Sequence, residues 1–345
     1  MCAPMELYRP QPVSSASQPV DQNTPPAEAA ARLRDGAVLR VTDQYKTGAE
    51  ILAQLARLLP PPGPKAPYAA RQAAQQAHWA AAMRLLAPIS GHKLALSGAG
   101  PIGFLADLYP GMGDFYLPFP QVQDMHSAWG RYRDGVPLAV LGHEIRPFYG
   151  TYVPTRTSHL ELFGTWLSQN GGNRGRAADV GTGCGVLAWM LCRAGFEDVL
   201  ATDISPNAIE SVTRDLRRHP APITLHRGDL LDGTDGDFDL IVFNPPWLPG
   251  AINSPLDRAL YFDSDDLFER FFAQAAARLR PNGRIVVLFS DVMSLLRPDI
   301  AHPIRAELER GNLHEVQVMR RRVKPPRGSK RRTRERVEIW ELARS

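Results

Sequence analysis

The sequence contains few of the residues that build disulfide frameworks or metal sites. Three of its 345 residues are cysteines, Cys2, Cys184 and Cys192, and no two of them form a C-x-x-C pair. Its nine histidines lack the spacing of metal ligands, and only His159 lies near a segment with other functional signals. We therefore expect a reducing, cytoplasmic setting and no bound metal.

Long apolar runs and internal repeats are also missing. No stretch of about 18 apolar residues could span a bilayer, and no apolar signal core follows Met1. Hydrophobic residues still make up 44% of the chain, which is long enough for one large domain or two smaller ones. These features predict a globular protein with a sizeable core and no membrane association.

Positive charge is concentrated in one segment. The net charge is only +4, yet residues 320–336 contain ten Lys and Arg and a single acid, Glu335. Such a segment is commonly a solvated loop, but this density of unbalanced cations also suits a polyanion, with RNA or the ribosome as the natural partner. Both interpretations stay open at this point.

The first 155 residues predict an arm, a small domain and a connector. Residues 1–30 are rich in Pro, Ala, Ser and Gln without a period, which predicts a disordered arm. TGAEILAQLARLL (47–59) opens with a Thr-x-x-Glu capping box, and a second helix is expected over residues 68–87. We predict a smaller, mostly helical N-terminal domain over residues 31–135, which would recognise the substrate, and a hairpin-like connector over residues 136–155.

From residue 176 onward, strand and helix patterns alternate, which predicts an α/β fold: a Rossmann-like, doubly wound sheet of seven strands. The first four strands are expected at RAADVG, TDIS, ITLH and DLIVFN, and a further buried strand at RIVVLFSD. Crossover helices are expected over residues 205–218, 263–279 and 300–310. HEVQVMRRRV and ERVEIWELA predict a terminal antiparallel hairpin, joined by the basic loop 320–336.

The turn after the first strand, DVGTGCG (179–185), suits a ligand. Gly181, Gly183 and Gly185 would let a ligand lie against the backbone, although such turns also serve simple packing. Asp203 ends the second strand 22 residues after Gly181, near the spacing at which an acid reaches the hydroxyl pair of a ribose.

The residue after this turn narrows the choice of ligand. A pyrophosphate would require a small residue where Val186 stands, so the pattern favours a nucleoside without phosphates. S-adenosyl-L-methionine is the common cofactor of that kind, and Asp179 would suit its amino group.

The fourth strand ends in NPPW (244–247), next to the expected cofactor. The side-chain oxygen of Asn244 and the carbonyl of Pro245 could each accept one N–H bond from a planar amine. Pro245 and Pro246 would hold that geometry, and Trp247 offers a flat face for stacking. This arrangement predicts methyl transfer to a nitrogen that needs no general base before attack.

In this order, GTGCG, Asp203 and NPPW resemble the class I S-adenosylmethionine-dependent methyltransferases, specifically the branch that methylates planar nitrogen. Residues 131–156 (RYRDGVPLAVLGHEIRPFYGTYVPTR) are similar to the segment before the catalytic domain in the HemK/PrmC family, which methylates a glutamine amide of peptide-chain release factors. The likeness covers roughly residues 131–291, and it implies a methyltransferase domain over residues 156–345.

The resemblance also implies roles for individual residues. The methionine part would be held by Gly181, Thr182, Gly183, Cys184 and Gly185. Asp203 would bind the ribose, and Asp229 or Leu230 the adenine. Asn244 would border the cofactor, and Asn244, Pro245, Pro246 and Trp247 would clamp the substrate amide, with Trp247 standing where the family usually has tyrosine.

The acceptor stays open on the sequence alone. The leading hypothesis is an N-methyltransferase acting on a macromolecule, either a protein glutamine or an exocyclic base nitrogen of RNA or DNA. A small-molecule N-methyltransferase is the alternative within enzymes. A non-catalytic ribosome-binding or nucleic-acid-binding module on a methyltransferase fold is the alternative outside them.

Overall fold

The computed structural model describes residues 6–14, 16–63, 66–154, 156–170, 172–250, 261–262, 266–323 and 334–345. The chain divides into two compact units, Leu7–Arg133 and Asp134–Ser345. The predicted connector 136–155 therefore belongs to the second unit. Most of the predicted basic loop, residues 324–333, lies outside the described residues.

The first unit is an α/β domain in which helices outweigh strands, as predicted, but it also contains a small sheet that the sequence did not predict. Its sheet has the order β1-β2-β3-β4, and β5 also pairs with β3. The strands are short and separated by helices, which is why the helical pattern dominates the sequence. The elements are β1 (Gln18–Val20), α1 (Pro26–Arg34), β2 (Leu39–Val41), α2 (Tyr45–Leu58), α3 (Tyr68–Ala82), β3 (Leu85–Ser90), β4 (Lys93–Leu94), α4 (Phe104–Leu108), β5 (Phe115–Pro118) and α5 (Phe119–Asp134).

The prediction of a disordered arm over residues 1–30 was wrong for residues 18–30, which contain β1 and the start of α1. β1 pairs in parallel with β2, and α1 begins with proline at its first turn. Val20, Ala29 and Ala30 are buried with Leu33. Alanine buries little surface but allows close helix packing. Because the segment has low hydrophobicity, its sequence did not indicate that it packs against the domain.

Two helix boundaries differ from prediction. α2 begins at Tyr45 with Gln44 as its N-cap, so Thr47 lies buried inside the first turn and forms no capping box. α3 ends at Ala82, because the leucines that follow continue as β3, which pairs with β2 and β5. Tertiary strand pairing here outweighs the helical propensity of the alanine run.

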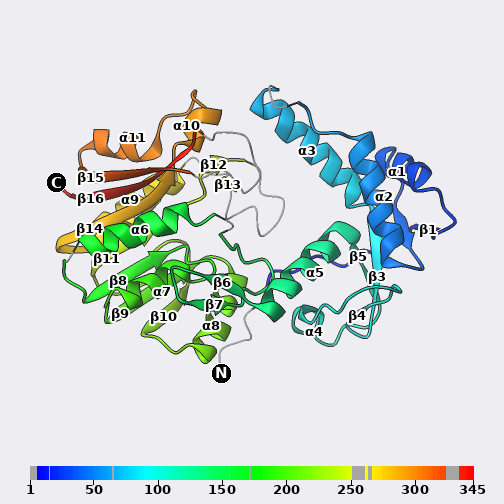
Figure 1. Cartoon of the computed structure of the whole chain (residues 1–345), viewed down its shortest axis with the longest axis horizontal. Coiled ribbons are helices and arrows are strands. Elements are labelled where there is room, and N and C mark those ends of the chain that lie inside the picture. The colour runs from blue at the N-terminus through cyan, green and yellow to red at the C-terminus, as the bar shows by residue number, and fades with distance from the viewer. Residues whose placement is uncertain are drawn as a thin grey trace. The chain divides into compact units, whose positions relative to one another are not determined.

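The second unit confirms the predicted seven-stranded sheet (Figure 1). The strand order is β10-β9-β8-β11-β14-β16-β15, with β16 antiparallel to both neighbours, so the terminal hairpin is confirmed. The first part contains β6 (Val136–Leu138), β7 (His143–Ile145), α6 (Ser158–Gln169), β8 (Arg176–Val180), α7 (Val186–Arg193), β9 (Asp198–Asp203), α8 (Pro206–Arg218) and β10 (Ile223–Arg227). The rest contains β11 (Phe238–Phe243), β12 (Leu248–Pro249), β13 (Tyr261–Phe262), α9 (Leu267–Ala277), β14 (Leu279–Ser290), α10 (Val292–Leu296), α11 (Pro303–Arg310), β15 (Leu313–Arg322) and β16 (Arg336–Arg344).

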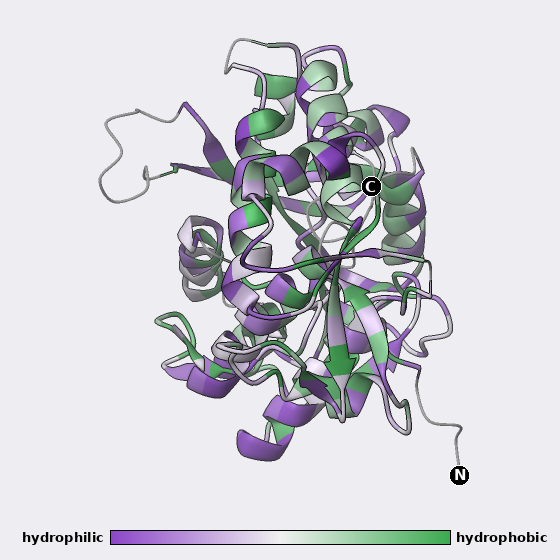
Figure 2. Ribbon diagram, turned by 90° about the vertical axis from the view of Figure 1, so that its right-hand side faces the viewer, coloured by the Kyte–Doolittle hydropathy of each residue, from purple (hydrophilic) through white to green (hydrophobic). Residues whose placement is uncertain are grey.

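Both faces of this sheet are buried, because consecutive residues of a strand point to opposite sides. One face packs on α6 and α7 through Ala177, Val199, Val242, Val286 and Ile339. The other packs on α9 and α11 through Ala178, Leu200, Ile241, Ile285 and Trp340. Figure 2 shows helices whose colour alternates between hydrophilic and hydrophobic, as expected for helices that pack one side on a sheet.

β6 and β7 form an antiparallel pair within the first half of the expected connector. Within the described ranges, no helix combines the length and the apolar character needed to cross a membrane.

Candidate functional site

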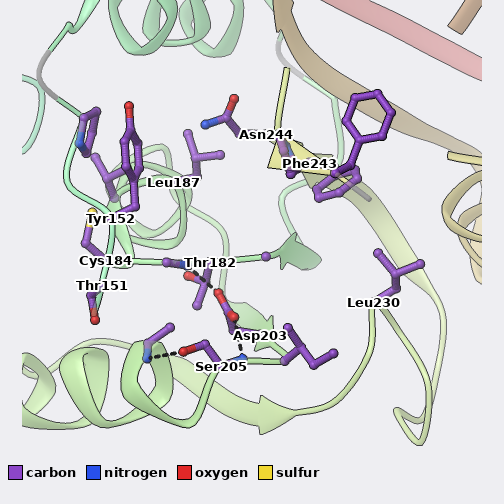
Figure 3. A pocket seen from close by; sticks show the side chains of 18 of the residues that line it. Thr151, Tyr152, Thr182, Cys184, Leu187, Asp203, Ser205, Leu230, Phe243 and Asn244 are labelled. Atoms are coloured by element: carbon purple, nitrogen blue, oxygen red, sulfur yellow. Dashed lines mark hydrogen bonds between the residues drawn. The ribbon is translucent and has the colours of Figure 1, made fainter. Parts of the chain in front are cut away.

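The predicted site residues meet at the carboxyl edge of the sheet. The loops after β8, β9, β10 and β11 line a cavity of 260 Å³, here called the glycine-loop cavity. In Figure 3, Asp203 and Asn244 lie across the open centre from each other, with Tyr152 toward one side and Leu230 toward the other. Among the predicted residues, its lining includes Gly181, Thr182, Gly183, Cys184, Asp203, Asp229, Leu230, Asn244 and Pro246.

The glycine loop is shaped for close approach of a ligand. Gly183 has a φ of +54°, and a Cβ placed there would meet no atom within 4 Å, so the backbone faces open space. Gly185, at φ +80°, serves packing instead, since a Cβ there would come within 3.0 Å of Val212. Burial raises the pKa of the Cys184 thiol to about 12, so this cysteine is a neutral packing residue.

Asp179 does not line the cavity. Its buried carboxylate accepts hydrogen bonds from the Thr182 hydroxyl (2.7 Å) and the Ala188 amide (2.9 Å). Burial raises its pKa to about 7. Asp179 therefore ties the glycine loop to the first turn of α7, and its contact with the cofactor stays a prediction.

Asp203 is fixed by two backbone amides. One carboxylate oxygen accepts from Gly183 N (2.9 Å), and the other accepts from Ser205 N (2.8 Å). These bonds hold the acid at the cavity wall (Figure 3), and each oxygen keeps lone-pair capacity for a further donor. Burial raises the pKa of Asp203, while the two amides oppose that rise.

The far end of the cavity is formed after β10. Leu230 is 7% exposed and has a φ of +57°, a conformation that costs a residue with a side chain about 1 kcal/mol or more. Asp229 forms an ion pair with Arg270 of α9, and both line the cavity. The apolar Leu230 and the acidic Asp229 together suit a heterocycle with an exocyclic amine.

Asn244 lines the cavity and carries an unpaired polar atom. Its Oδ1 is buried and has no hydrogen-bond partner among the described residues. Leaving a buried acceptor unsatisfied costs about 1–3 kcal/mol, which makes this oxygen a candidate acceptor for a donor that arrives with a ligand.

A second cavity of 410 Å³ adjoins the first and is here called the Trp247 cavity. Trp247 and Pro245 form part of its wall, and the Trp247 indole N–H donates to the Leu288 carbonyl (3.3 Å). The two cavities share four lining residues: Tyr152, His159, Asn244 and Tyr261. A group bound in one cavity can therefore meet a group bound in the other at Asn244.

His159 lies at this junction and is 3% exposed. Its Nε2 has no partner within the described part of the chain, and burial lowers its pKa to about 4. A neutral imidazole is therefore expected at neutral pH. A functional role for His159 stays a prediction.

The connector that carries Tyr152 is held by a polar stripe on α8. Asn207, Ser211 and Asp215 recur every four residues and are all buried. All three side chains bond to the backbone of the connector. Asp215 accepts from Arg146 N (3.0 Å), Ser211 Oγ accepts from Phe148 N (3.0 Å), and Asn207 Nδ2 donates to Tyr149 O (2.8 Å).

Sequence reasoning missed several lining residues. Tyr152, Tyr261 and Arg270 line the glycine-loop cavity, and Arg156 and Glu335 line the Trp247 cavity. Glu335 could have been noticed in the sequence, because it is the single acid in the basic segment 320–336. In the described ranges, no three His, Cys, Asp or Glu residues form a group suited to a metal ion.

Part of the chain that contains these cavities is similar to known methyltransferases. Residues 160–297 match the methyltransferase small domain family. The release factor glutamine methyltransferase of Deinococcus radiodurans is 37% identical over 123 residues, which are 32% of this chain and 44% of that protein. The ribosomal RNA small subunit methyltransferase C of Alcanivorax borkumensis is 32% identical over 159 residues, 46% of this chain and 44% of that protein. The chain thus spans less than half the length of either relative.

Among solved structures, the ribosomal protein L11 methylase of Lactobacillus delbrueckii subsp. bulgaricus aligns at 22% identity with a TM-score of 0.40, covering 56% of this chain and 81% of that one. The strand order and the loops at the carboxyl edge resemble those of the class I S-adenosylmethionine-dependent methyltransferases, in agreement with the family match over residues 160–297. Within that class the chain resembles the HemK/PrmC release factor glutamine methyltransferases.

Proposed function

We propose that this protein transfers a methyl group from S-adenosylmethionine to a planar nitrogen of a macromolecule. The observation that carries the proposal is the buried, unpaired Oδ1 of Asn244, which lies where the glycine-loop cavity meets the Trp247 cavity. A nitrogen donor placed against this oxygen would satisfy it.

The glycine-loop cavity fits the methyl donor. The open backbone at Gly183 would border the methionine part, Asp203 would accept from the ribose hydroxyls, and Leu230 with Asp229 would border the adenine. When bound, S-adenosylmethionine supplies an electrophilic methyl group on a sulfonium.

The Trp247 cavity fits the acceptor. Asn244 Oδ1 would accept one N–H bond and turn the nitrogen lone pair toward the other cavity. The indole of Trp247, fixed by its bond to Leu288, would stack on the planar group. The nitrogen would take the methyl group that S-adenosylmethionine supplies, and the electron pair of the broken carbon–sulfur bond would stay on sulfur. The nitrogen would then release one proton to water, so no buried base is required.

Two features favour a macromolecule over a small acceptor. The relatives named above are methyltransferases of a release factor and of ribosomal RNA. Two exposed arginines, Arg322 and Arg336, also lie opposite each other at the end of the terminal hairpin. Val323 and Glu335, their neighbours in the chain, line the Trp247 cavity.

The test is incorporation of labelled methyl groups into an extract of cells that lack this protein. We expect label in the macromolecular fraction with the full chain, and none with the Asn244→Ala variant. Asn173→Ala is the matched control, because Asn173 pairs with Asp239 at the amino edge of the sheet. Label confined to small molecules, or a chain that binds no S-adenosylmethionine in calorimetry, would overturn the proposal.

A further inference from the structure

One face of α9 binds the loop between β10 and β11 (residues 228–237). Gln274 lies on this face and bonds to the loop through both atoms of its amide. Its Oε1 accepts from Leu231 N and its Nε2 donates to Asp232 Oδ1, each at 2.8 Å. Gln274 does not line the glycine-loop cavity, so it can act on a ligand there only through the loop.

Arg270 lies one turn before Gln274 on the same face, because residues four apart are neighbours on a helix. Its Nη1 donates to Asp229 Oδ2, and its Nε lies 3.1 Å from the carboxylate of Asp266, the N-cap residue of α9. Arg270 and Asp229 both line the glycine-loop cavity. The ion pair therefore fixes one oxygen of Asp229, while the other oxygen keeps its lone pairs for a further donor.

The loop contains a backbone conformation that needs support from its surroundings. Leu230 has a φ of +57°, in the left-handed region that residues with a side chain rarely adopt. Such conformations persist where neighbouring structure holds them, and they are common where a protein clamps a ligand. Arg270 binds the residue before Leu230, and Gln274 binds the residue after it. The orientation of Asp229 and Leu230 at the cavity wall is thus set from α9.

We propose that Arg270 and Gln274 are positioning residues that hold Asp229 and Leu230 against the adenine of S-adenosylmethionine. This inference rests on the proposed function, because it takes S-adenosylmethionine as the methyl donor. Asp229 Oδ1 accepts an N–H bond from the exocyclic amine of the base, and Leu230 packs on the ring. Without either α9 side chain, the loop is free to move Asp229 away from the amine.

The test compares two ligands that differ only at this amine. The first is S-adenosylhomocysteine, the demethylated form of the methyl donor, and the second is its analogue with unsubstituted purine as the base, here called the deamino analogue. Isothermal titration calorimetry of the full chain measures the affinity for each. Wild type should bind S-adenosylhomocysteine about tenfold or more tightly than the deamino analogue, the factor that one charge-assisted hydrogen bond provides.

Two variants remove the support from α9. In Arg270→Gln and in Gln274→Leu, the affinity for S-adenosylhomocysteine should fall while that for the deamino analogue changes little. The ratio of the two affinities should therefore move from about ten toward one. A general weakening of the fold would lower both affinities alike and leave their ratio unchanged, so the ratio separates positioning from stability.

Matched variants on the same helix serve as controls. Glu269→Gln removes an ion pair with Arg310 (3.2 Å) that lies away from the cavity, and it should keep the wild-type ratio. Arg270→Lys retains a cation beside Asp229 but loses the planar fork, so it should give a ratio between those of wild type and Arg270→Gln.

Each outcome bears on one proposal or on both. If wild type prefers S-adenosylhomocysteine and a variant keeps that preference, the positioning role of the replaced residue is overturned and the proposed function stands. If wild type binds both ligands equally, the contact between Asp229 and the amine is overturned, and the inference fails with it. If wild type binds neither ligand, both proposals are overturned.

Discussion

The imidazole of His159 stands edge-on against the indole of Trp247, with ring centroids 5.4 Å apart and ring planes at 86°. His159 is near the start of α6, whereas Trp247 follows β11, so this contact joins two segments that are distant in the chain. Edge-to-face pairs of this kind contribute about 0.5–1.5 kcal/mol beyond their buried area. The contact fixes the face that Trp247 presents to its cavity.

The first prediction concerns this histidine. Its pKa is lowered from 6.5 in the unfolded chain to about 4 in the fold, so the unfolded state binds the proton first. The stability that the neutral imidazole contributes is present above pH 6.5 and is lost as the pH falls toward 4. His159→Phe keeps a ring but cannot be protonated. As the pH falls through this window, the free energy of unfolding of the variant should therefore rise by about 3 kcal/mol relative to that of the wild type.

Denaturant unfolding of both proteins at several pH values measures this difference. Asp179, whose raised pKa acts in the opposite direction, is present in both proteins and cancels. A difference that does not change with pH would contradict the prediction.

The second prediction concerns Asp203. Asp203→Ala removes the charged acceptor proposed for the ribose hydroxyls, and S-adenosylmethionine affinity should fall tenfold or more. Isothermal titration calorimetry measures it. Asp198→Ala is the control, because Asp198 lies at the amino end of the same strand. Equal affinity of the Asp203 variant and wild type would refute the ribose assignment.

The third prediction separates binding from chemistry at Asn244. Asn244→Ala should retain most S-adenosylmethionine affinity but lose about 100-fold or more in turnover, because its oxygen positions the acceptor nitrogen. Comparing calorimetry with steady-state kinetics tests this. A parallel loss of affinity and turnover would instead indicate a cofactor or folding role.

The fourth prediction addresses the basic hairpin. Each phosphate contact on a single strand contributes about 0.7 to the dependence of log affinity on log salt. Replacing Arg322 and Arg336 by Ser should therefore flatten that slope for RNA by up to about 1.4 units. Arg217→Ser, an exposed arginine on α8, should leave it unchanged. The sequence also predicts a larger flattening for Arg327, Lys330, Arg331 and Arg332, which lie outside the described residues.

Much of the catalytic domain could be predicted from short-range pattern. Buried strands that end in DVGTGCG, Asp203 and NPPW determine a doubly wound sheet, and parallel strands bring their carboxyl ends to one edge. The glycine loop, Asp203, Asn244 and Trp247 therefore had to lie near one another once the sheet formed.

Only the tertiary structure decided the rest, because it depends on contacts between distant residues. Asp179 turns into the core to bond Thr182 and Ala188, and no spacing rule distinguishes that orientation from one toward a ligand. The first unit forms a sheet because short strands pair across helices, which overrides the alanine-rich pattern. Arg156 and Glu335 are 179 residues apart and meet only because β16 inserts between β14 and β15, which brings the start of β16 beside the segment before α6.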